Sequence, residues 1–232
     1  MLSEKLKAFI SYFTKGELVL WFTSVIVIVI SFLVFDKENF LTLIASLIGV
    51  TSLIFNAKGN PLGQFLIVVF SIFYAVISFK FAYYGEMITY LGMTAPMAIF
   101  SLISWLKNPY NENKSEVKVN RLQLKDVIIM LLLTVVVTLV FYHILDIFNT
   151  ENIIFSTMSV TTSFVAVFLT FRRSTFYAIG YAANDIILII MWISAVSFDI
   201  SYISVVVCFV IFLVNDIYGF ISWTKMQKRQ NS

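Results

Sequence analysis

The sequence predicts an all-α membrane protein with eight transmembrane helices. We expect two parallel three-helix repeats joined by a linker helix, a 3+1+3 arrangement, plus one extra helix at the N-terminus. Three observations lead to this prediction: an apolar composition, a series of long hydrophobic segments and a one-sided distribution of basic residues. Of the 232 residues, 60% are hydrophobic and only 12% are charged, whereas a soluble domain has roughly 25% charged residues.

A transmembrane helix needs about 20 mostly apolar residues, because the hydrocarbon core is about 30 Å thick and a helix rises about 1.5 Å per residue. Eight segments meet this requirement and are separated by polar turns. They are residues 18–35, 40–56, 61–80, 86–106, 126–148, 152–171, 174–196 and 200–223. The segments are continuously apolar, unlike the alternating strands of a membrane barrel. The stretch 107–125 is polar, and we expect it to be a solvated linker.

Basic residues test the number of spans. With eight spans, one side of the membrane receives both chain termini, the turn at Lys58, the loop 107–125 and the arginine pair at 172–173. Of the 16 lysines and arginines, only Lys37 and Lys80 fall on the other side. Positively charged loops stay in the cytoplasm. Both termini are therefore predicted to be cytoplasmic.

Two similar segments end the two predicted repeats. Phe100–Lys107 reads FSLISWLK and Tyr218–Lys225 reads YGFISWTK, so Ile-Ser-Trp-x-Lys occurs at matching helix ends. Upstream, Gly49–Phe55 lies opposite Thr161–Phe171, and a basic turn follows each segment. Chance similarity between apolar helices is the alternative explanation. Membrane transporters often contain such repeats and hold their substrate between the halves, near the middle of the membrane.

Both repeats start outside and end inside, so we expect an axis along the membrane normal to relate them. The prediction divides the chain into five parts. They are 1–39 (tail and extra helix), 40–106 (first repeat), 107–150 (loop and linker helix), 151–225 (second repeat) and 226–232 (basic cytoplasmic tail).

Several polar side chains fall in the middle of predicted spans, where they are costly unless they face a cavity or another helix. On the span 174–196, Tyr177, Tyr181 and Asn184 share one face. The last span carries an adjacent Asn-Asp pair midway along its length. These residues suggest a site for a small solute. The candidate binding residues are Asn184, Asn215, Gln64, Tyr181, Tyr177, Asp185, Trp192 and Tyr74.

Hydrogen bonding between helices is the alternative role for these side chains, worth about 0.6 kcal/mol on average. We favour that role for Ser71 and Ser222. The pairs at 184–185 and 215–216 place an amide beside a carboxylate in mid-membrane, which exceeds what packing needs. Glu86 fits either the outer mouth of a pathway or a solvated loop.

Enzyme and metal chemistry find no support in the sequence. The single histidine, His143, has no partner for a metal site, and the single cysteine, Cys208, sits in an apolar run where it fits packing. The turn Asn56–Pro61 lacks the glycine and Lys-Ser/Thr pattern of a phosphate-binding loop. We therefore expect no metal, no cofactor, no ATP-driven transport by this chain alone and no nucleic-acid partner.

Five short segments resemble one family of transporters. They are Phe55–Asn60, Tyr83–Glu86, Thr170–Arg173, Tyr181–Asp185 and Val214–Gly219. With the duplicated three-helix unit, they make residues 40–225 similar to the PnuC nicotinamide riboside transporters, whose fold resembles the sugar-transporting SWEET proteins. Many members have Trp-x-x-Trp after the arginine-rich turn, where this chain has neither tryptophan. Tyr181 or Trp192 is then expected to supply the stacking aromatic ring.

The resemblance implies a protein of the bacterial inner membrane that imports nicotinamide riboside by facilitated diffusion, with alternating access. A cytosolic kinase would trap the solute by phosphorylation, and a homo-oligomer is compatible with the sequence. An aromatic face attracts the pyridinium cation by about 0.5–2 kcal/mol, and asparagine can pair with the carboxamide. Asp185 could balance the positive ring. Thiamine or riboflavin as the solute, and a non-transporting structural membrane protein, are the alternatives.

Overall fold

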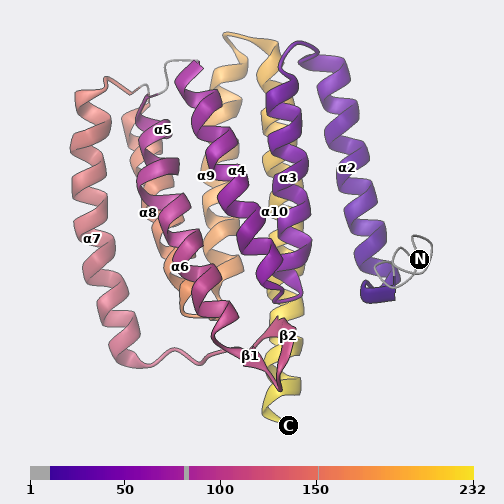
Figure 1. Ribbon diagram of the computed structural model, residues 1–232. Helices are drawn as coiled ribbons and strands as arrows, with labels where there is room; N and C mark the ends of the chain where they lie inside the picture. Colours follow the sequence, from indigo (N-terminus) through magenta and orange to yellow (C-terminus); the bar gives the residue numbers. More distant parts are fainter. Residues whose placement is uncertain (1–10, 81–83, 151) are drawn as a thin grey trace.

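Eight helical stretches in the described residues, 11–80, 84–150 and 152–232, are long and apolar enough to cross a membrane. In this computed structural model they stand side by side as an antiparallel bundle (Figure 1). The elements are α2 (Lys15–Phe35), α3 (Phe40–Ala57), α4 (Pro61–Lys80), α5 (Tyr84–Thr89), the π-helical turn η1 (Tyr90–Thr94), α6 (Ala95–Leu106), β1 (Pro109–Tyr110), β2 (Asn113–Val117), α7 (Leu124–Ile147), α8 (Ile153–Phe171), α9 (Tyr177–Val196), the 3-10 turn η2 (Ile200–Tyr202) and α10 (Ile203–Asn231).

The eight predicted spans are confirmed, and most of their boundaries agree within a few residues. The exception is α10, which continues to Asn231 rather than ending near residue 223. Large apolar side chains point away from the bundle; on α7, Leu132 is 65% exposed and Val135 is 59% exposed. A surface of this kind is stable in lipid but not in water.

The span that contains Pro96 is not a regular α-helix. Proline has no amide hydrogen and its ring clashes with the carbonyl four residues earlier. The π-helical turn η1 lies directly before α6, the helix in which Pro96 is the second residue. The hydroxyl of Thr94 donates to the carbonyl of Thr89 at 3.4 Å, which gives one carbonyl in this turn a partner. Such π-helical turns often lie at functional sites.

Six helices form a closed ring. Around the ring, α3 packs on α4, α4 on α6, α6 on α8, α8 on α9, α9 on α10, and α10 returns to α3. The helix α7 packs on α8 from outside, and α2 packs on α3 and α10. Figure 1 shows α2 and α7 at opposite flanks of the bundle. This placement agrees with an extra helix and a linker helix outside two sets of three, although the 3+1+3 repeat itself stays a prediction.

The turns after α3 and α8 have the same local geometry. Gly59 and Arg173 occupy equivalent places with φ of +66° and +56°, the left-handed conformation that commonly ends helices. The next residues, Asn60 and Ser174, each donate their backbone N–H to the carbonyl five residues earlier at 2.9 Å. Each also accepts, on its side-chain oxygen, the amide two residues later. These matched turns support the proposed duplication.

The C-terminal parts of α6 and α10 meet on the side of the bundle where α2 begins, which we call the terminal side (Figure 1). Trp105 and Trp223 are fully buried, and their ring centroids lie 5.3 Å apart. Each donates its indole N–H across to the other set of helices: Trp105 to the carbonyl of Thr170 at 3.0 Å, and Trp223 to that of Asn56 at 2.7 Å. The repeated tryptophan thus closes the terminal side of the ring.

The loop 107–125 is more ordered than the sequence prediction of a solvated linker. It contains the antiparallel hairpin β1–β2, whose turn residues Asn111 and Glu112 both have left-handed φ values. Val117 at the end of β2 is fully buried. The sequence did not predict the hairpin, because the alternation of Lys with Glu gives no sign of an inward-facing valine whose partners come from distant parts of the chain.

The same loop ties the two sets of helices together. The backbone N–H of Val117 donates to the carbonyl of Gly59 at 2.9 Å, and that of Asn120 donates to the carbonyl of Arg173 at 2.9 Å. The side chain of Gln230 at the end of α10 accepts from the Val119 amide at 2.8 Å. Figure 1 shows the hairpin beneath the bundle beside the C-terminal end of α10.

A charged cluster anchors the start of α2. Glu17 is 4% exposed and accepts from the Lys58 ammonium at 3.1 Å and the Tyr218 hydroxyl at 3.0 Å. It also closes a capping box with Thr14. The Lys58 ammonium lies 4.6 Å from the centroid of the Tyr12 ring. The extra helix is therefore joined to the turn after α3 and to α10.

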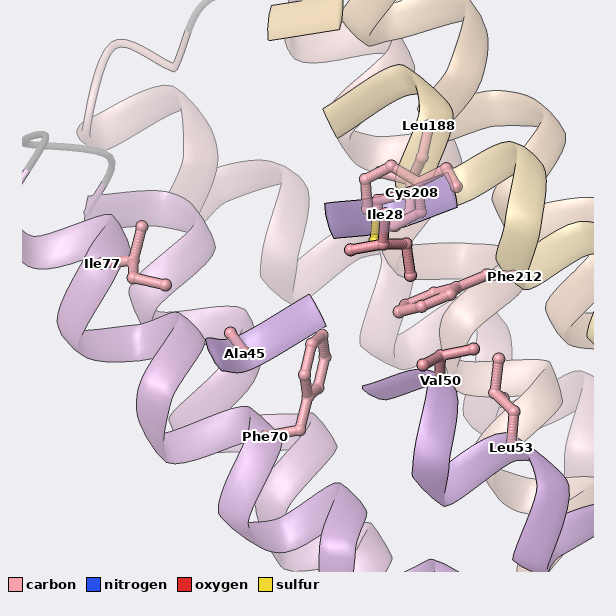
Figure 2. Close-up of a cluster of buried hydrophobic side chains, with 10 residues drawn as sticks. Ile28, Ala45, Val50, Leu53, Phe70, Ile77, Leu188, Cys208 and Phe212 are labelled. Atoms are coloured by element: carbon pink, nitrogen blue, oxygen red, sulfur yellow. The ribbon is translucent and has the colours of Figure 1, made fainter. Parts of the chain in front are cut away.

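The apolar core shown in Figure 2 lies between α2, α3, α4, α9 and α10. Phe70 of α4 and Phe212 of α10 meet edge to face, with centroids 6.3 Å apart. Cys208 is buried in this cluster as a free thiol, as the sequence predicts for a packing residue.

Candidate functional site

A cavity lies at the centre of the six-helix ring. Its volume, about 100 Å³, is several times the roughly 10–15 Å³ that one water molecule needs. Five of the ring helices, α3, α4, α8, α9 and α10, contribute to its wall; α5 and the π-helical turn η1, which precede α6, supply the sixth side, and Leu145 of α7 completes it. The polar or aromatic lining residues are Ser52, Asn56, Phe70, Glu86, Thr89, Tyr90, Thr94, Ser156, Ser159, Ser163, Tyr181, Asn184, Asp185, Phe209, Phe212 and Asp216.

Three carboxyl groups face this cavity from three different helices. Asp185 of α9 is 4% exposed and Asp216 of α10 is 3% exposed; Glu86 reaches the cavity from α5. One oxygen of Asp185 is buried without a hydrogen-bond partner among the described residues. The described lining residues include no lysine, arginine or histidine. The cavity is therefore suited to a cation and unsuited to an anion.

Asn184 is held in a fixed orientation. Its carbonyl oxygen accepts hydrogen bonds from Ser159 and Thr162 of α8, each at 3.0 Å. Both acceptor positions of the amide are thus used inside the protein, and its NH₂ group makes no hydrogen bond to the described residues. The side chain can therefore offer two donors to a solute.

Aromatic rings form part of the wall around these polar groups. Tyr181, Tyr90, Phe70 and Phe212 line the cavity, each from a different element. Phe70 and Tyr90 pack edge to face with centroids 6.0 Å apart. The arrangement combines flat apolar faces with carboxylates and an amide donor, which suits a flat cationic ring.

The structure brings three of the predicted residues, Tyr181, Asn184 and Asp185, together in the cavity. Two others lie next to it. Gln64 is buried and donates to the Asn56 side chain at 2.8 Å, so it positions a residue that lines the cavity. Tyr177 packs between Tyr181 and the buried pair Trp105–Trp223; its ring centroid lies 4.8 Å from that of Trp223.

The remaining predicted residues lie elsewhere. Asn215 points toward α2, where its NH₂ group donates to Ser24 at 3.0 Å and to the Ile211 carbonyl at 2.8 Å. Tyr74 and Trp192 line a second cavity on the side opposite the termini. Asn215 therefore serves packing in this conformation, and the two aromatic residues belong to a separate cavity.

Sequence reasoning missed two stripes of the cavity wall. Phe209, Phe212 and Asp216 recur at helical spacing on α10, and the lining serines of α8 follow the same period. Both patterns are visible in the sequence. For the adjacent pair on α10 the sequence favoured Asn215, whereas Asp216 lines the cavity; on α9 both members of the pair, Asn184 and Asp185, line it.

Comparison with known proteins adds three findings. A family described as "Nicotinamide mononucleotide transporter" has a model that matches residues 39–225. The chain is 26% identical over 203 residues to the nicotinamide riboside transporter PnuC of Neisseria mucosa, covering 85% of this chain and 77% of that one. It is 24% identical over 214 residues to the protein of the same name from Haemophilus influenzae, covering 92% of each chain.

The fold has a known counterpart as well. A crystal structure of the vitamin B3 transporter PnuC matches with a TM-score of 0.78 and 24% identity, over 94% of each chain. The likeness shows that the arrangement of helices is shared.

Proposed function

Because this chain belongs to the nicotinamide mononucleotide transporter family, and is therefore a membrane transporter rather than an enzyme, we propose that its substrate is nicotinamide riboside. The names of its two relatives support this choice. The observation that carries the proposal is the lining of the central cavity: three carboxyl groups face it, and its described lining residues hold no basic side chain.

This lining should favour binding of the riboside over binding of its phosphorylated form. Nicotinamide riboside has a positive pyridinium ring and no phosphate. A phosphate monoester carries about −1.5 to −2 charges at pH 7. Burying such a group beside carboxylates, without an arginine or lysine to pair with it, costs several kcal/mol or more. The cavity therefore favours the riboside over the mononucleotide for which the family is named.

Each part of the riboside finds a chemical partner in the wall. The carboxyl groups of Asp185 and Asp216 would balance the pyridinium charge, and the ring of Tyr181 would stack on it. The free NH₂ group of Asn184 would donate to the carboxamide oxygen. The serine hydroxyls of α8 would pair with the ribose hydroxyls.

Transport would proceed by alternating access and facilitated diffusion. The cavity lies where the two sets of three helices meet, so rocking of one set against the other would open it to each side in turn. No nucleotide-binding motif supplies energy, and a cytosolic kinase would trap the riboside. The one-sided basic residues support a protein of the bacterial inner membrane with both termini in the cytoplasm.

Thiamine is the second candidate, since it is also an aromatic cation, whereas the carboxylates give neutral riboflavin no advantage. Equilibrium binding of radiolabelled riboside, mononucleotide, thiamine and riboflavin to the purified protein tests these alternatives. The riboside should bind at least about tenfold tighter than the others, which corresponds to about 1.4 kcal/mol. Tighter binding of the mononucleotide or riboflavin would overturn the proposal, and no binding at all would favour a structural membrane protein.

A further inference from the structure

A second cavity opens on the side of the bundle opposite the termini. We call it the outer vestibule; its wall includes Asp36, Tyr74, Glu86, Trp192, Asp199 and Tyr202. Two predicted site residues, Tyr74 and Trp192, lie here and not in the central cavity. The vestibule thus accounts for sequence features that the central site leaves unexplained.

Three carboxylates converge on the vestibule from separate elements. Asp36 ends α2, Glu86 belongs to α5, and Asp199 precedes η2. Its described lining residues include no lysine or arginine. A concave surface lined by one sign of charge concentrates ions of the opposite sign.

Aromatic rings complete the wall. Trp192 and Tyr202 pack with centroids 5.1 Å apart, and Tyr74 lies in the same wall. The indole nitrogen of Trp192 is buried without a hydrogen-bond partner among the described residues. A buried donor left unpaired is costly, so a ligand that offers an acceptor would be stabilised here. Together with the carboxylates, these groups fit an aromatic cation that carries an oxygen acceptor.

The vestibule adjoins the central cavity. Glu86 lines both. The ring of Tyr74 in the vestibule lies 4.6 Å by centroids from the ring of Tyr90 in the central cavity. One carboxylate and one pair of tyrosines thus form the partition between the two spaces.

We propose that the outer vestibule is a second binding site, which holds aromatic cations before they pass the Tyr74–Tyr90 pair. The direction of passage rests on the proposed function, but the binding chemistry does not. Asp36 and Asp199 also have local structural roles: Asp36 accepts from the Asn39 side chain at 2.5 Å, and Asp199 accepts from the Ser201 amide at 2.9 Å. Asparagine can fill both roles, so Asp→Asn changes remove charge while keeping the turns.

Fluorescence quenching of Trp192 by 1-methylnicotinamide, an aromatic cation without ribose, tests the site directly. The protein has four tryptophans; Trp105 and Trp223 are fully buried, and Trp21 is removed with Trp21→Phe. In this background, quenching should saturate with the cation and not with neutral nicotinamide. It should disappear in Trp192→Phe.

Charge variants identify the carboxylates. Asp36→Asn with Asp199→Asn should raise the half-saturating concentration at least about twofold, since each charge contact near the surface is worth at least about 0.2 kcal/mol. The matched control is Asp146→Asn. Asp146 is an exposed carboxylate near the C-terminal end of α7 and does not line the vestibule, so this change should leave the half-saturating concentration unaltered. Melting curves verify that each variant is folded.

Two further results separate this proposal from the proposed function. Asp185→Asn, in the central cavity, should leave the quenching of Trp192 unchanged. Saturable quenching in a protein that does not transport nicotinamide riboside would contradict the proposed function alone. Quenching that rises linearly with the cation, or that is equal in the double variant and the Asp146 control, would overturn the vestibule site.

Discussion

Asp185 of α9 and Asp216 of α10 are close neighbours, carboxyl beside carboxyl, on the wall of the central cavity. Both are almost fully buried. Two acidic groups so close together repel each other when both are ionised. A cation placed between them would relieve that repulsion, and the proposed function assigns this role to the pyridinium ring.

Asp185→Asn should weaken binding of nicotinamide riboside strongly. The amide keeps the size of the carboxyl group and can still bond Asp216, but one negative charge is lost. A hydrogen bond or contact to a charged group is worth about 1.5–3 kcal/mol, or roughly 10- to 150-fold in affinity. Titration calorimetry measures the change, with the exposed Asp146→Asn as control. Equal affinity in both variants would exclude Asp185 from the site.

Asn184 and Asn215 should respond differently to replacement by leucine. Asn184→Leu removes donors that face the cavity and should weaken riboside binding by about 1–3 kcal/mol, or roughly 5- to 150-fold. Asn215→Leu removes the bond to Ser24 of α2, and should lower the melting temperature while sparing the affinity of the folded protein. Calorimetry beside a melting curve in detergent compares the two. The reverse pattern would show that Asn215 contacts the solute.

This pair of asparagines shows what the sequence could and could not predict. Hydropathy and charge predicted eight spans and a shared side for the termini, because lipid imposes those constraints on each helix by itself. Which neighbour a polar side chain meets depends on helix packing, which no local pattern contains. Asn215 bonds Ser24, which is far away in the chain. The position of Asn215 within its helix therefore could not distinguish a hydrogen bond between helices from a role in solute binding.

The hairpin and the π-helical turn also depend on tertiary contacts that the sequence does not reveal. Pro96 shows that a regular helix is disfavoured there, but the form of the π-helical turn, in which Tyr90 and Thr94 line the cavity, depends on how the neighbouring helices pack. In the loop 107–125, Val117 finds its partner at Gly59. Such contacts join distant segments of the chain and cannot be predicted from the sequence of either segment.

The cluster around Glu17 should stabilise the attachment of α2. Glu17→Gln leaves the Lys58 ammonium without its carboxylate, and the lost charged hydrogen bond should cost about 1–3 kcal/mol. A lower melting temperature in detergent is the expected result. Glu38→Gln, in the exposed turn after α2, is the matched control and should melt like the parent. Equal melting of both variants would mean that the cluster contributes nothing to stability.

The orientation in the membrane is open to a direct measurement. Reporter fusions after Lys37, Asn149 and Asp199 should lie outside, because these residues follow the ends of α2, α7 and α9, on the side opposite the start of α2 and the end of α10 (Figure 1). Fusions after Lys114 and Ser232 should lie in the cytoplasm with the basic residues. An external signal at Lys114 would reverse the proposed direction of the pathway.

Uptake by proteoliposomes tests the central claim most directly, that an acidic cavity carries the cationic riboside and rejects its phosphorylated form. Vesicles without ATP or an ion gradient receive labelled nicotinamide riboside or labelled nicotinamide mononucleotide. The riboside should equilibrate to the outside concentration and accumulate beyond it only when a riboside kinase and ATP are enclosed, while the mononucleotide stays outside. Uptake of the mononucleotide as fast as the riboside, or exclusion of both, would contradict the account.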